Sequence, residues 1–440
     1  MMKRFLLCMM MVCSLFSVHP VKAENNDSLN TYYENAAKDF SIFANRLYFE
    51  GYLKNHDVDE EVYNHYARVE DDWYYHDEEG RIARFWQNVN DQKILFTSSG
   101  IRDTDDAIAD ILSSMSLEEK AGQLFNIRPE DLAYDYQYVS DDTRRVYEEI
   151  PVGGFTLFAQ NISSPEQTVQ MTQDLHALND IPPLLSIDEE GGIVARIGQN
   201  YNFPVTRYNN MGYLSADDAF DAGYTIGSYL KEYGFDLDFA PVADVNTNPY
   251  NPIIGTRAFS SDPAIAAQMI SDCIQGFHDA GILTCAKHFP GHGDTQTDSH
   301  LGYAATYKSW DELIDCEMLP FTAAIEEGTD FIMVAHICAP NVTGDSVPSS
   351  LNPVIMDKLR NELGYNGIII TDALGMGAIS NYYSSAEASI QALEAGADVL
   401  LMPANIYNAY HGVIEAVETG RLSEERIDAS VYRILKVKLK

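Results

Sequence analysis

Residues 287–300 bring an unusual number of polar side chains together. They read Lys-His-Phe-Pro-Gly-His-Gly-Asp-Thr-Gln-Thr-Asp-Ser-His, in a chain that has only 11 histidines among 440 residues. A Pro-Gly-x-Gly run cannot continue a helix or a strand. We therefore predict an irregular loop here, an element on which binding and catalytic residues are often displayed.

Two residues near the end of this loop have the spacing of a proton-transfer pair. Asp298 and His300 flank Ser299, and a carboxylate two residues from an imidazole can orient it and raise its basicity. Taken alone, such a sequence usually makes only a local hydrogen bond. Beside a nucleophile, it would supply the proton shuttle that covalent double displacement needs.

The same loop also resembles a set of metal ligands. The candidates are His288, His292, Asp294, Asp298 and His300. Zinc sites usually combine a close pair of ligands on a regular element with a more distant third ligand, whereas these residues follow one another along a single loop. Crowded polar residues also need one another as hydrogen-bond partners. We therefore predict no metal at this site.

Short apolar runs recur after residue 116, and most are preceded by a helix-like stretch. The eight runs are 123–127, 155–158, 184–187, 237–240, 283–286, 331–334, 367–370 and 399–402. Continuous apolar strands that alternate with helices predict a parallel sheet covered by helices, and eight such units fit a (β/α)8 barrel of the TIM type. A doubly wound sheet is the rival fold, but no G-x-G-x-x-G follows an early strand. We predict the barrel, and no cofactor.

Several of these runs end in residues that could do chemistry. Asp188, Lys287 with His288, His336 and Asp372 each follow an apolar run closely. Active sites of (β/α)8 barrels lie at the C-terminal ends of the strands, so these side chains should meet. Asp372 could serve as a nucleophile, a general base, a metal ligand or a structural acceptor.

A second polar cluster follows the run at 184–187. It reads Asp188-Glu189-Glu190-Gly191-Gly192 and is followed by Arg196, while Arg257 comes later in Gly-Thr-Arg-Ala-Phe. Carboxylates and guanidinium groups that point into one cleft suit a polyhydroxylated ligand, because both can engage neighbouring hydroxyls in pairs. A network of salt bridges at the rim is the alternative.

Residues 1–23 have the pattern of a secretory signal peptide. Lys3 and Arg4 precede an apolar run over 5–18, and Val21-Lys22-Ala23 offers a cleavage site. A membrane-spanning helix needs about 20 apolar residues, more than this run contains. We expect cleavage near Ala23, a secreted or periplasmic protein, and no stable membrane insertion after cleavage.

Residues 24–105 differ from the rest in being rich in Tyr, Asp, Glu and Asn. Apolar and aromatic positions such as Phe43, Leu47 and Tyr48 have helical spacing. We predict a mostly helical N-terminal extension that packs on the main domain at 106–440. A surface of aromatic side chains that contacts carbohydrate is the alternative for this segment.

The charge and the cysteines exclude several kinds of partner. The net charge of −37 repels phosphate backbones and anionic lipids, so nucleic-acid and membrane-surface roles are not expected. Four cysteines follow the predicted cleavage site, namely Cys273, Cys285, Cys316 and Cys338. None is part of a C-x-x-C pair, which argues against a zinc ribbon. Disulfides and buried free thiols both remain open.

From about Ser116 onward, the sequence resembles glycoside hydrolase family 3, and specifically its bacterial β-N-acetylglucosaminidase branch. The ordered landmarks are Gly153-Gly154-Phe155, Ile187-Asp188-Glu189-Glu190-Gly191-Gly192, Arg257-Ala258-Phe259, residues 287–293, Asp298-Ser299-His300, residues 333–336, Thr371-Asp372-Ala373-Leu374 and Ala395-Gly396-Ala397-Asp398. Lys-His-Phe-Pro-Gly-His-Gly followed by Asp-Ser-His is specific for that branch. The chain departs from the family at Glu189, where glutamine is usual, at Ile193, where arginine is usual, and at Ser260.

The resemblance implies a role for each matching residue. Asp372 would be the nucleophile, and His300, oriented by Asp298, would be the acid and base. The residues implied to hold the sugar are Asp188, Arg196, Arg257, Lys287 and His288. Most retaining glycosidases use a second carboxylic acid as acid and base, whereas an imidazole with an ordinary pKa near 6.5 exchanges protons around neutrality without strong burial.

The resemblance also implies an activity. It is a retaining exo-β-N-acetylglucosaminidase (a β-N-acetylhexosaminidase), which the predicted signal peptide would export. We expect it to act on peptidoglycan fragments or chitin-like oligosaccharides, so the expected partner is a glycan that contains N-acetylglucosamine. One alternative is a phosphorylase that uses the same site, because a histidine carries no negative charge to repel phosphate. The other is a sugar-binding barrel without catalysis.

Overall fold

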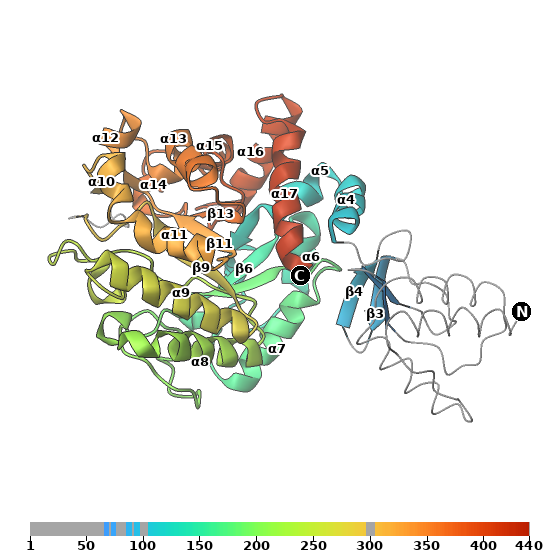
Figure 1. Ribbon diagram of the computed structural model, residues 1–440. Coiled ribbons are helices and arrows are strands. Elements are labelled where there is room, and N and C mark those ends of the chain that lie inside the picture. The colour runs from blue at the N-terminus through green and yellow to red at the C-terminus, as the bar shows by residue number, and fades with distance from the viewer. Residues whose placement is uncertain are drawn as a thin grey trace, which may run out of the picture. The chain divides into compact units, whose positions relative to one another are not determined.

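The computed structural model describes residues 66–69, 72–75, 85–89, 92–96, 104–295 and 304–439. The chain forms two compact units (Figure 1), one of Met1–Ser114 with Leu439–Lys440 and one of Met115–Lys438. Residues 1–23, on which the predicted signal peptide falls, lie outside the described residues. Among the helices of the described residues, none is long and apolar enough to cross a membrane.

The first unit contains strands where a mostly helical extension was expected. Its described elements are β1 (Tyr66–Val69), β2 (Asp72–Tyr75), β3 (Phe85–Val89), β4 (Gln92–Phe96) and α4 (Thr104–Ser114). β1 pairs antiparallel with β2, and β3 with β4. These segments are rich in aromatic and β-branched residues, which favour strands. The prediction of a mostly helical segment over 24–105 is therefore wrong for its described part, and residues 24–65 lie outside it.

The second unit is built on an eight-stranded parallel sheet. The strands are β5 (Phe125–Ile127), β6 (Gly154–Leu157), β7 (Leu184–Ile187), β8 (Leu237–Asp238), β9 (Leu283–Phe289), β11 (Phe331–Val334), β13 (Ile368–Thr371) and β14 (Leu400–Leu401). From β5 to β13 each strand of this sheet pairs with the next in chain order, and β14 pairs with β5. A parallel bridge between Ile370 and Val399 closes the ring. The predicted (β/α)8 barrel is confirmed, and each predicted run overlaps one strand of the barrel.

Helices surround this barrel (Figure 1). They are α5 (Leu117–Gln123), α6 (Asp141–Glu149), α7 (Pro165–His176), α8 (Ala219–Glu232), α9 (Pro263–Asp279), α10 (Trp310–Ile314), α11 (Met318–Glu326), α12 (Pro340–Thr343), α13 (Pro353–Asp357), α14 (Gly377–Ser380), α15 (Ser385–Ala395), α16 (Ile406–Glu418) and α17 (Glu424–Lys438). Two short strands, β10 (Ala304–Ala305) and β12 (Ile337–Cys338), pair outside the barrel. Side-chain caps mark several helix starts. For example, Ser116 and Glu119 form a reciprocal capping box at α5.

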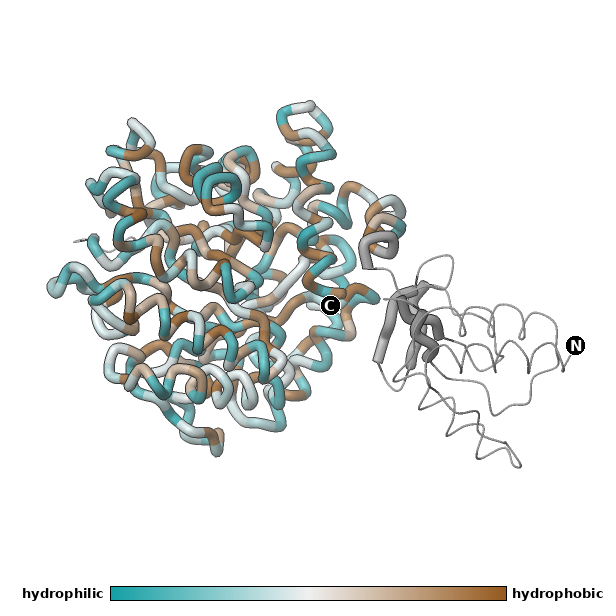
Figure 2. Tube along the Cα trace, viewed as in Figure 1, coloured by the Kyte–Doolittle hydropathy of each residue, from teal (hydrophilic) through white to brown (hydrophobic). Residues whose placement is uncertain are grey.

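The apolar core lies in and around the strands. Ile368, Ile369 and Ile370 of β13 are fully buried, and hydrophobic segments gather along the central strands in Figure 2. Strands covered on both faces read as continuous apolar runs rather than as alternating patterns. For this reason the barrel strands could be predicted from the sequence as apolar runs.

One arrangement is repeated three times at the N-terminal ends of the strands. An aspartate that precedes one strand accepts a hydrogen bond from a backbone N–H at the start of the neighbouring strand, and it also pairs with a basic side chain from a helical segment. The pairs are His176–Asp236 at 2.8 Å, His278–Asp330 at 3.0 Å and Arg360–Asp398 at 2.6 Å. The backbone donors are Leu185, Thr284 and Ile369. Each aspartate therefore joins two strands and one helix.

Asp398 makes the most contacts of the three. Its carboxylate is buried and also accepts from Ser430 at 2.7 Å and Arg433 at 3.0 Å. We expect Asp398→Ala to lower the free energy of unfolding by about 3–5 kcal/mol, because the largely buried Arg360 would lose its counter-charge. Urea unfolding followed by circular dichroism measures this loss. As a control, Glu394→Ala removes a partner of the surface residue Arg421 and should lower the free energy of unfolding by at most about 1 kcal/mol. Equal losses in the two variants would contradict the role of Asp398 as the counter-charge of Arg360.

Candidate active site

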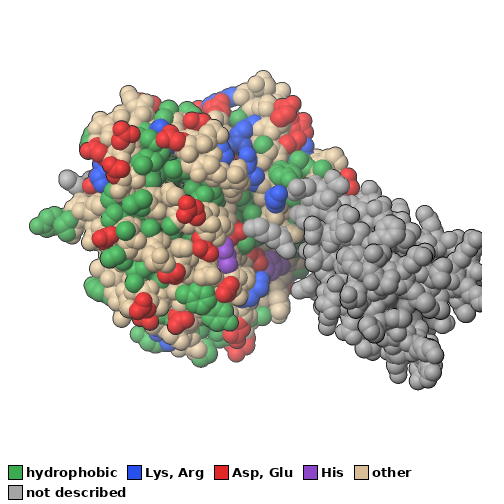
Figure 3. Space-filling view, viewed as in Figure 1, with side chains coloured by type: hydrophobic (Ala, Val, Ile, Leu, Met, Phe, Trp, Pro, Cys, Tyr) green, Lys and Arg blue, Asp and Glu red, His purple; other side chains and the backbone are tan. Residues whose placement is uncertain are grey.

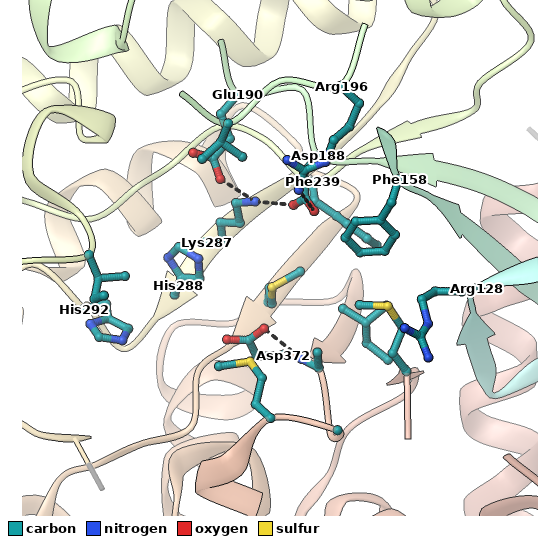
Figure 4. A pocket seen from close by; sticks show the side chains of 18 of the residues that line it. Arg128, Phe158, Asp188, Glu190, Arg196, Phe239, Lys287, His288, His292 and Asp372 are labelled. Carbon is teal, nitrogen blue, oxygen red and sulfur yellow. Dashed lines mark hydrogen bonds and ion pairs between the residues drawn. The ribbon is translucent and has the colours of Figure 1, made fainter. Parts of the chain in front are cut away.

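A cavity of about 700 Å³ opens at the C-terminal ends of the barrel strands. This volume is in the range of small-molecule sites. Six predicted site residues line it together, namely Asp188, Arg196, Arg257, Lys287, His288 and Asp372. All of them except Arg257 are labelled in Figure 4. The six residues come from the ends of β7, β9 and β13 and from the loops after β7 and β8. Their convergence is what the strand-end positions predicted.

Lys287 lies at the centre of an ion-pair network on one wall of the cavity. Its Nζ is 2.8 Å from Asp188 Oδ1 and 2.7 Å from Glu190 Oε1. Only 3% of the Lys287 side chain is exposed. Burial tends to lower the pKa of Lys287, but the two carboxylates outweigh it and raise the pKa above its ordinary value. The ammonium group therefore stays charged.

Each carboxylate of this network also binds an arginine. Arg196 Nη2 is 3.1 Å from Asp188, and Arg257 makes a bidentate pair with Glu190 at 2.7 and 2.8 Å. Burial tends to raise the pKa of Asp188 and Glu190, but the neighbouring cations outweigh it and lower both pKa values. Glu190 was not among the predicted site residues, although its place beside Asp188 in the acidic run was a signal.

A register shift in β9 explains how neighbouring residues face the same cavity. Met333 of β11 pairs with Lys287, whereas the next residue, Val334, pairs with Phe289. His288 is therefore an extra residue in β9. Successive side chains of a regular strand point to opposite faces, and an irregularity of this kind re-aims them. Both Lys287 and His288 line the cavity as a result.

Asp244 holds His288 and the start of the loop at 287–300. Its Oδ2 lies 2.7 Å from His288 Nδ1, and its Oδ1 accepts the backbone N–H of His292. Burial tends to raise the pKa of Asp244, but His288 and His292 lower it overall. Sequence reasoning missed this residue, and an aspartate within the apolar stretch Pro-Val-Ala-Asp-Val was the available signal.

The glycines of the loop are required by its path. Gly291 has a φ of +115°, a conformation that side chains rarely allow. A Cβ atom on Gly293 would lie 1.9 Å from the carbonyl oxygen of Val245.

The other residues of this loop that were predicted to do chemistry differ in what the structure describes. Burial and the neighbouring His288 lower the pKa of His292, which keeps its imidazole neutral. Residues 296–303, and with them the predicted proton-transfer residues Asp298 and His300, lie outside the described residues.

Glu189 binds the backbone of the segment that carries Arg196, one of the residues in the Lys287 ion-pair network. Its buried carboxylate accepts hydrogen bonds from the backbone N–H groups of Arg196, Ile197 and Gly198 and from the Tyr229 hydroxyl. A glutamine amide, the family's usual group here, would turn an NH2 toward some of these donors. Glu189 thus fixes the backbone that carries Arg196. Burial raises the pKa of Glu189, and the backbone donors offset this only in part.

Asp372 lies across the cavity from the Lys287 network (Figure 4). It directly follows β13, and its Oδ1 accepts the backbone N–H of Ala373 at 2.7 Å. His336, at the end of β11, lies 2.9 Å from the Ala373 carbonyl oxygen and 2.7 Å from Ser350. His336 therefore helps to position the segment that carries Asp372.

The cysteines and the groups of possible metal ligands can be located only within the described residues, which do not include Asp298 and His300. Cys273, Cys285 and Cys316 are free thiols, and the Cys338 thiol donates a hydrogen bond to the Ser346 carbonyl oxygen. In the same part of the chain, no group of three or more His, Cys, Asp or Glu side chains is arranged to hold a metal ion. Burial raises the pKa of Cys273 and Cys285, so neither thiol is a reactive thiolate.

The fold and the cavity together define a (β/α)8-barrel protein with a carboxylate opposite an ion-paired polar wall. Residues 116–437 match the glycosyl hydrolase family 3 N terminal domain. The chain therefore belongs to glycoside hydrolase family 3, as its sequence landmarks predicted. This membership also confirms that the protein is a glycoside hydrolase by family.

Named relatives agree with this assignment. β-Hexosaminidase A of Pseudoalteromonas piscicida is 35% identical over 319 residues, which cover 66% of this chain and 53% of the relative. The β-hexosaminidase of Nitrosomonas eutropha is 33% identical over 305 residues, covering 66% and 87%. A solved family 3 β-N-acetylglucosaminidase from a Paenibacillus species is 37% identical with a TM-score of 0.69, covering 74% and 62%. The chain thus spans about half of the first relative and most of the second, and the predicted resemblance to this branch is confirmed.

The lowered pKa of Glu190 leads to a prediction about stability and pH. An unfolded glutamate titrates near pH 4.3, and the folded pKa is lower. The ion pairs of Glu190 therefore stabilise the fold above about pH 4.3, and this stability is lost as the pH falls through the folded pKa. We expect Glu190→Gln to be less stable than the wild type at pH 7, and to lose less stability between about pH 5 and 3.

Urea unfolding at several pH values measures this difference. Glu418→Gln, on the exposed end of α16, is the matched control and should follow the wild-type curve. A Glu190→Gln curve parallel to that of the wild type between pH 5 and 3 would show that Glu190 is not an ionised partner of Lys287.

Proposed function

We propose that this protein is an exported, retaining exo-β-N-acetylglucosaminidase. It removes terminal β-linked N-acetylglucosamine from peptidoglycan fragments or chitin-like oligosaccharides. The observation that carries the proposal is the position of Asp372, which shares one cavity with Asp188, Arg196, Arg257, Lys287 and His288. Relatives of 33–35% identity that are named β-hexosaminidases support the same activity.

The polar wall suits the hydroxyl groups of a terminal sugar. Asp188 and Glu190 are acceptors, whereas Arg196, Arg257 and Lys287 are donors, and all have fixed partners. Within the described residues, the buried Nε of Arg196 has no hydrogen-bond partner. A buried donor without a partner is costly, and a bound hydroxyl oxygen would satisfy it. A sugar held against this wall presents its anomeric carbon toward Asp372.

The reaction then proceeds by double displacement. The Asp372 carboxylate attacks the anomeric carbon and forms a covalent glycosyl-enzyme, while His300 donates a proton to the departing glycosidic oxygen. His300, now neutral, next removes a proton from a water molecule, which attacks the same carbon and releases the sugar and Asp372. Asp298 orients the imidazole throughout. The ion-paired wall needs no rearrangement for these steps, and such preorganisation lowers the barrier.

Two variants separate the nucleophile from the acid. We expect Asp372→Asn to lose at least about 1,000-fold in kcat/KM on both an aryl N-acetyl-β-glucosaminide and an N-acetylglucosamine disaccharide. His300→Ala should lose about 100- to 10,000-fold on the disaccharide but less on a dinitrophenyl glycoside, whose leaving group needs no proton. Release of the chromophore and of free sugar measures both rates.

The controls also decide among the alternatives. Asp174→Asn, on the surface of α7, should keep the wild-type rate. An unchanged rate in Asp372→Asn would overturn the assignment, and sugar-1-phosphate as the main product in phosphate buffer would identify a phosphorylase instead. Binding of N-acetylglucosamine without turnover would identify a sugar-binding barrel.

Export is a separate part of the proposal. The basic residues Lys3 and Arg4, the apolar run at 5–18 and the small residues at 21–23 support it. In the native host we expect the protein outside the cytoplasm with Glu24 as its first residue, which N-terminal sequencing of fractionated cells measures. Leu6→Arg with Leu7→Arg should retain the uncleaved chain in the cytoplasm, because the apolar run is broken. A wild-type protein that starts at Met1 in the cytoplasm would contradict export.

A further inference from the structure

Exposed tyrosines are concentrated on one face of the barrel unit. Within the described residues, nine of ten tyrosines with exposed side chains belong to the connections that leave the C-terminal strand ends, or to the first turn of the following helix. They are Tyr134, Tyr136 and Tyr138 after β5, Tyr201 and Tyr213 after β7, Tyr250 after β8, Tyr307 after β9, Tyr382 after β13 and Tyr407 in α16. The tenth, Tyr224, lies within α8. The cavity opens on this same face.

Tyrosines at the opposite ends of the strands are buried. Tyr233 and Tyr365, which lie in segments that lead into β8 and β13, are 4% and 3% exposed. The Tyr365 hydroxyl donates to backbone carbonyl oxygens of Thr329 and Ile368. A tyrosine-rich composition alone would place exposed rings on both faces. Instead, the tyrosines are exposed at the C-terminal ends of the strands and buried at the N-terminal ends. Tyr134, Tyr201 and Tyr250 are each about nine-tenths exposed.

The segments that carry these rings are anchored beside the cavity. Asn161 Nδ2 donates to the Tyr136 carbonyl oxygen at 2.8 Å, and Gln137 Nε2 donates to the carbonyl oxygen of Gln160, which lines the cavity. On another side, the Tyr250 N–H donates to Asn248, whose own side chain donates to Thr295. The backbone beside Tyr136 and Tyr250 is thus fixed, and their side chains are exposed. At Tyr201 the Arg207 guanidinium lies over one face of the ring, 4.9 Å from its centroid.

We propose that this face binds a glycan chain longer than the cavity can hold, with tyrosine rings stacked on sugar rings that lie outside it. A pyranose presents C–H bonds on its flat faces, and tyrosine offers a rigid apolar ring with a polar tip at low entropic cost. Exposed apolar groups gathered around a ligand cavity commonly mark a binding surface. The identity of the glycan rests on the proposed function, whereas the surface itself does not.

The charge of the protein favours a neutral ligand for this surface. The chain carries a net charge of −37, and acidic side chains are spread over the visible face of the barrel in Figure 3. Anionic polymers and anionic membranes are repelled by such a field. Stacking between tyrosine and sugar needs no charge on either side. An uncharged stretch of polysaccharide is therefore the occupant that fits.

The test measures binding to insoluble polymer with Asp372→Asn protein, which should not digest it. We expect the fraction bound to chitin powder, an uncharged polymer of N-acetylglucosamine, to be large for this protein. Adding Tyr134→Ser with Tyr138→Ser, or Tyr201→Ser with Tyr250→Ser, should weaken the affinity at least about tenfold. Adding Tyr224→Ser is the matched control, because it removes an exposed tyrosine away from this face, and its affinity should stay within about twofold.

Three results would overturn the proposal. The first is an unchanged affinity for the polymer in both double variants. The second is a loss of affinity in the Tyr224→Ser control as large as that in the double variants. The third is a change in oligomeric state, without polymer, that depends on these tyrosines, because the face would then be a contact between copies of the protein. Equal unfolding midpoints establish that all variants are folded. If wild-type protein fails to cleave an aryl N-acetyl-β-glucosaminide while its tyrosine-dependent polymer binding persists, the proposed function falls and this inference stands.

Discussion

The buried ammonium group of Lys287 is the constraint on which the candidate active site depends. Its Nζ lies within 2.8 Å of both Asp188 and Glu190, and an isolated charge at this depth would be too costly to keep. The lysine therefore requires both carboxylates, and each carboxylate in turn holds an arginine. Three parallel strands must end at the same level to bring these groups together. The closed barrel meets that requirement, with Asp372 placed opposite the network.

The barrel and much of the site could be predicted because both depend on strands that are visible in the sequence. Ile368, Ile369 and Ile370 are buried on every side, so β13 reads as an unbroken apolar run, and the same holds for its neighbours. Asp188 directly follows such a run, and Asp372 directly follows β13. In a parallel barrel that position alone places a side chain at the cavity, without knowledge of its partners.

Other features depend on contacts between distant segments and left weaker signals. Asp244 forms a hydrogen bond with His288, which lies 44 residues later in the chain. No local sequence pattern predicts that pairing. The register shift at His288 likewise arises between β9 and β11. In the extension, the helical spacing at Phe43 and Leu47 lies outside the described residues. The described strands β1 to β4 are rich in aromatic and β-branched residues and form two antiparallel pairs. Short apolar runs are ambiguous between helices and strands.

The aspartates at the N-terminal strand ends have a consequence for how the protein could change. Asp236, Asp330 and Asp398 tie strands to helices at the end of the barrel remote from the cavity, so part of the scaffold's integrity does not depend on the connections around the mouth. Those connections could be lengthened, shortened or exchanged between homologues while the framework persists. New ligand preferences could then arise by loop replacement. A designer could likewise graft new loops onto the C-terminal ends of the strands without redesigning the contacts at the N-terminal ends.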